Sequence, residues 1–119
     1  MEIKLLYRVS EKFSDGHHEQ LTEWETARFT DDTDARLYVA SLIDEVLKAQ
    51  GQGRRLYVGF GPNVLKSGVI IESGDGSGVW VSARRTGYIP RGVTTRDAFG
   101  NDVMGAATAV INALAEPRR

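Results

Sequence analysis

Apolar residues recur along this chain at two spacings, and the order in which these spacings follow one another limits the folds that the chain can adopt. In residues 3–9 every second residue is apolar, which is typical of a strand with one buried face. A polar turn follows at residues 14–18. Residues 21–29, rich in threonine and aromatic residues, then predict a strand that returns antiparallel to the first. The chain therefore begins with a predicted hairpin.

The spacing then changes to that of a helix. Residues 31–34 contain three aspartates, which can cap a helix N-terminus and place negative charge at its positive end. The apolar residues that follow at helical spacing are Val39, Leu42, Ile43 and Val46. The pattern ends at residues 51–53, Gly-Gln-Gly, where a glycine can adopt the left-handed conformation of a C-terminal cap.

Three further strand patterns follow this helix. Residues 55–60 alternate between apolar and polar, and residues 69–71 form a β-branched run that is typical of a strand covered on both faces. Residues 79–83 alternate again, and we predict that Trp80 lies in the core.

The last part of the chain predicts a loop and a second helix. We expect residues 86–100 to be an irregular loop with a short helical turn at residues 94–98. The final helical stripe consists of Val103, Ala107, Val110, Ile111 and Leu114. The predicted order is β-β-α-β-β-β-α. It corresponds to a single α+β domain over residues 1–119, with a mostly antiparallel sheet and two helices packed on it.

Composition excludes several classes of protein. The absence of cysteine excludes disulfides, zinc–thiolate sites and cysteine nucleophiles. No signal peptide or long apolar segment is evident, so we expect a soluble, cytoplasmic protein without a membrane partner. The net charge of -1 excludes a whole-protein electrostatic attraction to nucleic acid.

This small net charge conceals an uneven distribution of charge. Residues 1–50 carry eleven acidic and six basic side chains, whereas residues 51–119 carry five acidic and nine basic ones. Because both halves belong to one domain, we expect an acidic face and a basic face.

The residues that could carry chemistry form no catalytic or metal-binding motif. His17 and His18 are adjacent on a polar turn, where their side chains should diverge. Glu23 and Glu25 are two residues apart on a predicted strand, so we expect them to share a solvated face, with Trp24 on the other. We therefore predict no catalytic residue, no metal ligand and no cofactor, and a protein that is not an enzyme.

The most suggestive group of residues combines arginines with a tyrosine in the second half of the chain. Its members are Arg84, Arg85, Tyr88, Arg91 and Arg96. Guanidinium groups and aromatic rings bind carboxylates, phosphates and bases. Three interpretations stay open: a solvated basic face, a surface that recognises an acidic protein, and a site for a nucleotide or nucleic acid.

The layout of the chain resembles that of the small immunity proteins of bacterial polymorphic toxin systems. The similarity lies in the helix at residues 34–46, the strands at residues 56–59, 68–71 and 78–82, and the last helix at residues 106–111. This resemblance implies an α+β domain that binds a toxin made beside it and blocks the toxin's active site, without a catalytic residue of its own.

Two hypotheses about function follow. The leading one is a non-catalytic inhibitory protein whose partner is a protein toxin. In the alternative, suggested by similarity to small phage proteins that counter bacterial immunity, the arginine group sequesters a small phosphorylated or cyclic nucleotide in a pocket between the subunits of a homo-oligomer. An enzyme and a subunit of a larger structural assembly are weaker hypotheses.

Overall fold

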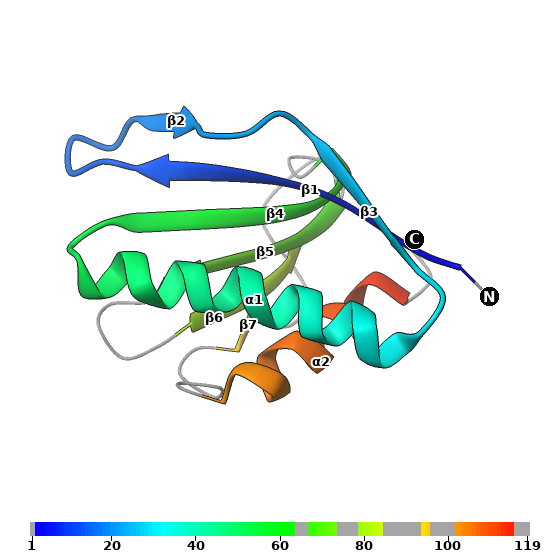
Figure 1. Cartoon of the computed structure of the whole chain (residues 1–119). Helices are drawn as coiled ribbons and strands as arrows, with labels where there is room; N and C mark the ends of the chain where they lie inside the picture. Colours follow the sequence, from blue (N-terminus) through cyan, green and yellow to red (C-terminus); the bar gives the residue numbers. More distant parts are fainter. Residues whose placement is uncertain (1, 64–66, 74–78, 85–93, 96–101, 116–119) are drawn as a thin grey trace.

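The computed structural model of the chain describes residues 2–63, 67–73, 79–84, 94–95 and 102–115 (Figure 1). Within these residues the chain forms seven strands and two helices. They are β1 (Ile3–Lys12), β2 (His18–Gln20), β3 (Glu25–Phe29), α1 (Asp32–Gly51), β4 (Arg55–Asn63), β5 (Ser67–Ser73), β6 (Val79–Arg84), β7 (Thr94–Thr95) and α2 (Val103–Ala115). The predicted α+β class and element order are confirmed. The predicted strand at residues 21–29 is shortened to β3, and β2 and β7 are additional short strands.

All strand pairs are antiparallel, and the order across the sheet is β2-β1-β4-β5-β6-β7, with β3 also paired to β1. β3 and β4 lie on opposite sides of β1 and both run antiparallel to it, so they are parallel to each other. α1 connects them and therefore crosses over β1, as in a split β-α-β unit.

The prediction of a helical turn at residues 94–98 is wrong for its first two residues. Thr94 and Thr95 form β7 and pair with Ser82 and Val81 of β6. The edge of β6 offers hydrogen-bond partners that are distant in sequence. A local sequence pattern does not indicate such pairing.

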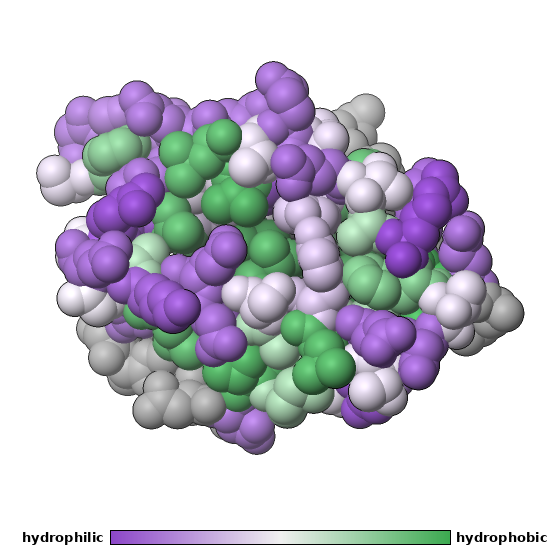
Figure 2. All heavy atoms as spheres, in the orientation of Figure 1, coloured by the Kyte–Doolittle hydropathy of each residue, from purple (hydrophilic) through white to green (hydrophobic). Residues whose placement is uncertain are grey.

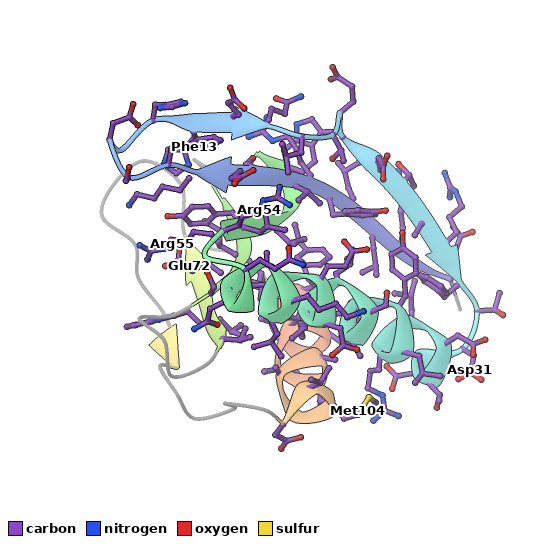
Figure 3. The ribbon with its side chains drawn as sticks, turned by 60° about the vertical axis from the view of Figure 1, so that its left-hand side comes forward. Phe13, Asp31, Arg54, Arg55, Glu72 and Met104 are labelled. Atoms are coloured by element: carbon purple, nitrogen blue, oxygen red, sulfur yellow. The ribbon has the colours of Figure 1, made fainter. Side chains whose placement is uncertain are left out.

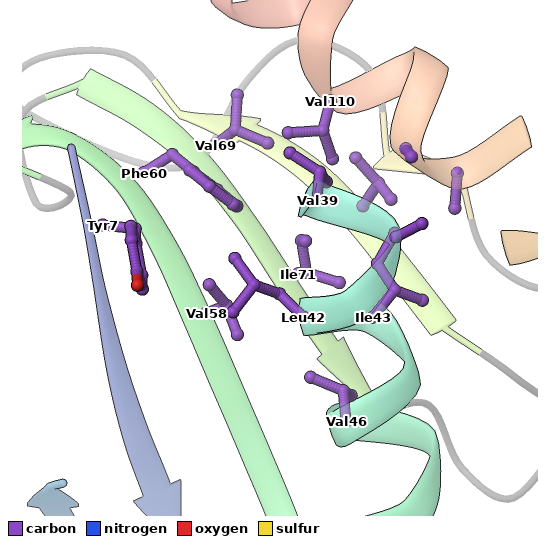
Figure 4. Close-up of a cluster of buried hydrophobic side chains, with 14 of the residues drawn as sticks. Tyr7, Val39, Leu42, Ile43, Val46, Val58, Phe60, Val69, Ile71 and Val110 are labelled. Atoms are coloured by element: carbon purple, nitrogen blue, oxygen red, sulfur yellow. The ribbon is translucent and has the colours of Figure 1, made fainter. Parts of the chain in front are cut away.

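Both helices lie on the same side of the sheet, which we call the inner face (Figure 1). α1 packs on β4 and β5, α2 packs on β5 and β6, and the two helices pack on each other. The fully buried core residues of the sheet and of α1 include Leu5, Val39, Ile43, Val46, Val58, Phe60, Ile71 and Val79. Figure 4 shows the α1 side chains directed at Val58 and Ile71, with Val110 of α2 beside them. The predicted stripe of α1 is therefore confirmed as core.

The ends of α1 are fixed by the residues that the sequence indicates. At the start, the Asp31 side chain accepts a hydrogen bond of 2.8 Å from the Thr33 backbone N–H. At the end, Gly53 has a φ of 75° and donates to the Gln50 carbonyl, while the Arg54 N–H donates to the Ala49 carbonyl. This is a Schellman motif, in which glycine avoids the strain of a left-handed residue.

In the described part of the chain, neither helix is long and apolar enough to cross a membrane.

Two predictions about buried strand residues are wrong. Trp80 and Ile70 are only half-buried, because they alternate with Val79, Val81 and Ile71 and so lie on the face opposite the helices. A β-branched run predicts cover on both faces, but both helices of this fold lie on the inner face, and strand alternation places every second residue of β5 and β6 away from them.

Candidate functional site

The arginine group predicted from the sequence falls mainly outside the described residues. Arg84 ends β6, where its backbone pairs with Gly68 of β5. The other four members, Arg85, Tyr88, Arg91 and Arg96, lie outside the described residues. The side chains that the structure does bring together belong mainly to the first half of the chain.

Two consecutive arginines form ion pairs: Arg54, which directly precedes β4, and Arg55, which begins it (Figure 3). Arg54 donates from Nε and Nη2 to Oε2 and Oε1 of Glu11, at 3.1 and 2.8 Å. Glu11 is only 8% exposed, so this bidentate contact replaces hydration that the carboxylate has lost. The hydrogen bonds between the two groups lower the pKa of Glu11 and raise the pKa of Arg54. Arg55 Nη2 lies 3.8 Å from Glu72 Oε1 on β5. These contacts join neighbouring elements and are structural.

A tyrosine cluster joins β1, β3 and α1. The Tyr7 hydroxyl donates to Oε2 of Glu25 at 2.8 Å and is in hydrogen-bond contact with the Tyr38 hydroxyl. The Tyr7 ring also packs edge-on against Tyr38, with 5.8 Å between the ring centroids, and near Phe60. Burial, followed by these hydrogen bonds, raises the pKa of Tyr7 above its ordinary value. Its proton is held in contacts within the fold.

The pairing of β1 with the returning strand is interrupted by a bulge. Ser10 pairs with Gln20, and Tyr7 pairs with Glu25. Two residues of β1 therefore lie opposite four residues, 21–24, of the returning strand. Extra residues of this kind bend an edge strand and redirect its side chains, and such bulges are frequent beside functional sites.

Hydrogen bonds fix the backbone of the bulge. The N–H groups of Leu21 and Thr22 both donate to the Val9 carbonyl, at 2.9 and 3.3 Å. The Val9 N–H donates to the Thr22 hydroxyl oxygen at 3.1 Å. A threonine side chain thus takes the place of a strand carbonyl, which satisfies the Val9 amide where the ladder is broken.

Glu23 and Glu25 are both exposed, as the sequence predicts, but Glu23 lies in the bulge and outside β3, so the two do not form a pair on one strand face. Glu25 accepts its hydrogen bond from the inner-face Tyr7, whereas Glu23 accepts one of 3.3 Å from Nε2 of Gln20. Residues 21–24 lie outside the regular strand pairing, so the period-two alternation does not determine the directions of their side chains. The two carboxylates therefore have different surroundings and cannot act as paired groups.

Five residues lie at the bulge, and we call them the bulge cluster: Arg8, Gln20, Leu21, Glu23 and Trp24. The Arg8 guanidinium lies over the Trp24 ring, 4.8 Å from its centroid. Arg8 Nη1 also donates to Oε1 of Gln20 at 3.2 Å, and Gln20 in turn donates to Glu23. Leu21 is 45% exposed. The cluster is therefore an ordered surface group with an exposed apolar side chain.

The same edge of the sheet is acidic. Its four exposed carboxylates, which we call the acidic edge, belong to Asp15, Glu19, Glu23 and Glu25. Residues 13–27 contain no lysine or arginine, and among the described residues none of these carboxylates forms an ion pair with either. Glu19 is also the direct cross-strand partner of Glu11. Like charges opposite each other in a sheet are destabilising, so the charge of Glu19 does not serve the stability of the fold.

The two histidines of the first turn have different partners. His17 stacks on Phe13 and contacts Asp15, whose pKa is lowered first by the His17 backbone N–H and then by its ring. The His18 ring instead lies 5.1 Å from the Tyr57 ring, measured between centroids. Among the described residues, no group of three potential metal ligands is present.

The sequence did not indicate the bulge cluster. Arg8 reads as an ordinary polar residue of an alternating strand, and its contact with Trp24 depends on the two extra residues of the bulge. On the face that carries the helices, Figure 2 shows hydrophilic side chains over the β1–β2 hairpin and along α1, with apolar side chains between them.

The chain matches no protein-family model, and no curated protein or solved structure is significantly similar to it.

Proposed function

We propose that this protein is a non-catalytic inhibitory protein that binds and occludes a protein partner, as the immunity proteins of bacterial polymorphic toxin systems do. The acidic edge is the observation that carries this proposal. Four exposed carboxylates, unpaired with lysine or arginine among the described residues, give this edge a negative potential, and Glu19 is repelled by Glu11 on the opposite strand. A basic surface on a partner would relieve this repulsion and would be attracted over a long range.

The groups with shifted pKa values support a binding function. Such groups are candidates for catalysis when they lie in a site. Here Glu11 is bound by Arg54, and Tyr7 is bound to Glu25 and Tyr38, so each shift has a cause within the fold. Proton transfer to a substrate would require these contacts to break.

The proposed place of action is the cytoplasm of the producing cell, where a toxin must be neutralised before its release. Attraction between an acidic inhibitor and a basic toxin accelerates association, and this acceleration weakens as salt screens the charges. Tight binding of the toxin domain would cover its active site, so the inhibitor needs no catalytic group.

A growth assay tests this proposal. The product of each neighbouring gene is expressed alone and together with this protein. We expect one product to arrest growth and this protein to restore it. Glu19→Gln/Glu23→Gln should weaken the rescue, whereas Asp44→Asn/Glu45→Gln, which removes the same charge from exposed positions of α1, should not. If no neighbouring product is neutralised, the proposal is wrong.

A further inference from the structure

We infer that the bulge cluster makes the main contacts with a protein partner that binds at the acidic edge. Leu21 and Trp24 enter apolar recesses of this partner, and the rim around these recesses is basic. This inference rests on the proposed function and adds to it the contacting residues and the chemistry of the partner. Four observations support it: the order of the cluster, the exposure of Leu21, the position of the bulge and the charge around it.

The cluster is ordered before any partner binds. Arg8 is held by the Trp24 ring and by Gln20, and Gln20 is held in turn by Glu23. Tryptophan and arginine are enriched among the residues that dominate binding energy in protein interfaces. A side chain that is already held in one conformation loses less entropy when it binds, so this arrangement favours affinity.

The position of the apolar side chains distinguishes this surface from the rest of the molecule. Leu37 and Met104 on the helices are also exposed, and exposure alone is ordinary for single apolar side chains. Leu21 differs because it lies in the same four-residue bulge as Trp24. Bulges and charges protect a sheet edge from pairing with other strands, but that protection does not require an exposed leucine or a tryptophan.

The charge of the edge identifies the class of partner. Glu19 lies two residues before Leu21 along the chain, and Glu23 lies two residues after it. A nucleic acid would be repelled by these carboxylates because of its phosphates. A protein surface with lysine or arginine around an apolar recess complements both features, since charged rims around apolar centres are typical of protein interfaces.

The test uses the full chain, labelled with ¹⁵N, and two synthetic octapeptides as probes. One peptide alternates lysine and leucine, and the other alternates glutamate and leucine. We expect the lysine peptide to shift the amide signals of Arg8, Leu21 and Glu23 and the indole signal of Trp24, and the glutamate peptide to leave them in place. Signals of α1 around Leu37 should not move with either peptide.

Matched variants make the test specific. Trp24→Ala is expected to weaken binding of the lysine peptide about tenfold, and Leu21→Ala about fivefold, as is usual for anchor residues. Leu37→Ala removes an equally apolar, exposed side chain from α1 and should change the affinity less than about twofold. The inference is overturned if the shifts centre on another surface, or if both bulge variants bind as tightly as the wild type.

The inference and the proposed function can fail separately. If a toxin is neutralised equally well by the wild type and by Leu21→Ala/Trp24→Ala, the proposed function stands and the bulge cluster is not its anchor. If the lysine peptide binds at the bulge but no toxin is neutralised, the inference that the bulge cluster is a binding surface is upheld, and the proposed inhibitory function is wrong.

Discussion

The inner face of the sheet and its bulged edge contain similar kinds of residue in opposite arrangements. On the inner face, apolar side chains are buried and charged groups are paired, as Glu11 is with Arg54. At the bulged edge, Leu21 is exposed, and Glu19 lies opposite Glu11 without a lysine or arginine partner among the described residues. The first region is arranged for the stability of this chain. We propose that the second serves contact with another molecule, and we expect substitutions to separate these two properties.

Truncation of one side chain in each region should give the largest contrast. Ile43 is fully buried between α1 and the sheet, so Ile43→Ala is expected to lower the free energy of unfolding by about 2–5 kcal/mol. Leu21→Ala, at an exposed position, should change it by less than about 0.5 kcal/mol. Urea unfolding followed by circular dichroism measures both. Similar losses for the two variants would contradict the division between regions.

The ion pair of the inner face should appear as a pH dependence of stability. Because Arg54 lowers the pKa of Glu11, the unfolded carboxyl binds a proton at a pH where the folded one does not. Its contribution is therefore present at neutral pH and is lost as the pH falls below about 5 and through the folded pKa. In Glu11→Gln, unfolding free energies measured from pH 7 to pH 3 should decrease less steeply. An unchanged slope would show that the pair does not stabilise the fold.

Loss of the tyrosine hydroxyl should have a smaller effect. Tyr7→Phe removes the contacts to Glu25 and Tyr38 and leaves the ring in place, so we expect a loss of about 1 kcal/mol. Tyr38→Phe removes only the contact between the two hydroxyls and should cost less. If Tyr38→Phe lowers the free energy of unfolding more than Tyr7→Phe does, the Tyr7 hydroxyl is not the central group of this cluster.

Most of the fold could be predicted from the sequence because its elements follow local rules. The stripe that includes Val39 and Ile43, the Asp31 cap and the glycine at residue 53 each indicate a structure that the chain adopts. Trp80 was misplaced because no local pattern states which face of a sheet the helices cover. The pairing of β7 with β6 was missed for a similar reason, since it depends on residues distant in sequence.

The candidate site was much less predictable. The arginine group from the sequence lies mainly outside the described residues, and it stays a prediction. The bulge cluster depends on two extra residues opposite β1, and alternation rules assume that no such residues occur. Thr22, whose hydroxyl replaces a backbone acceptor, is an ordinary strand residue by type, so the sequence carries no local signal of the interruption.

We propose that the charges of Glu19 and Glu23 serve binding and do not contribute to stability. The most direct test is the unfolding free energy of Glu19→Gln/Glu23→Gln, measured in urea at low salt and neutral pH. Removal of the charge opposite Glu11 and of the repulsion along the edge should leave stability unchanged or raise it by about 0.5 kcal/mol. A loss of more than about 0.5 kcal/mol would show that these carboxylates stabilise the fold and would contradict this proposal.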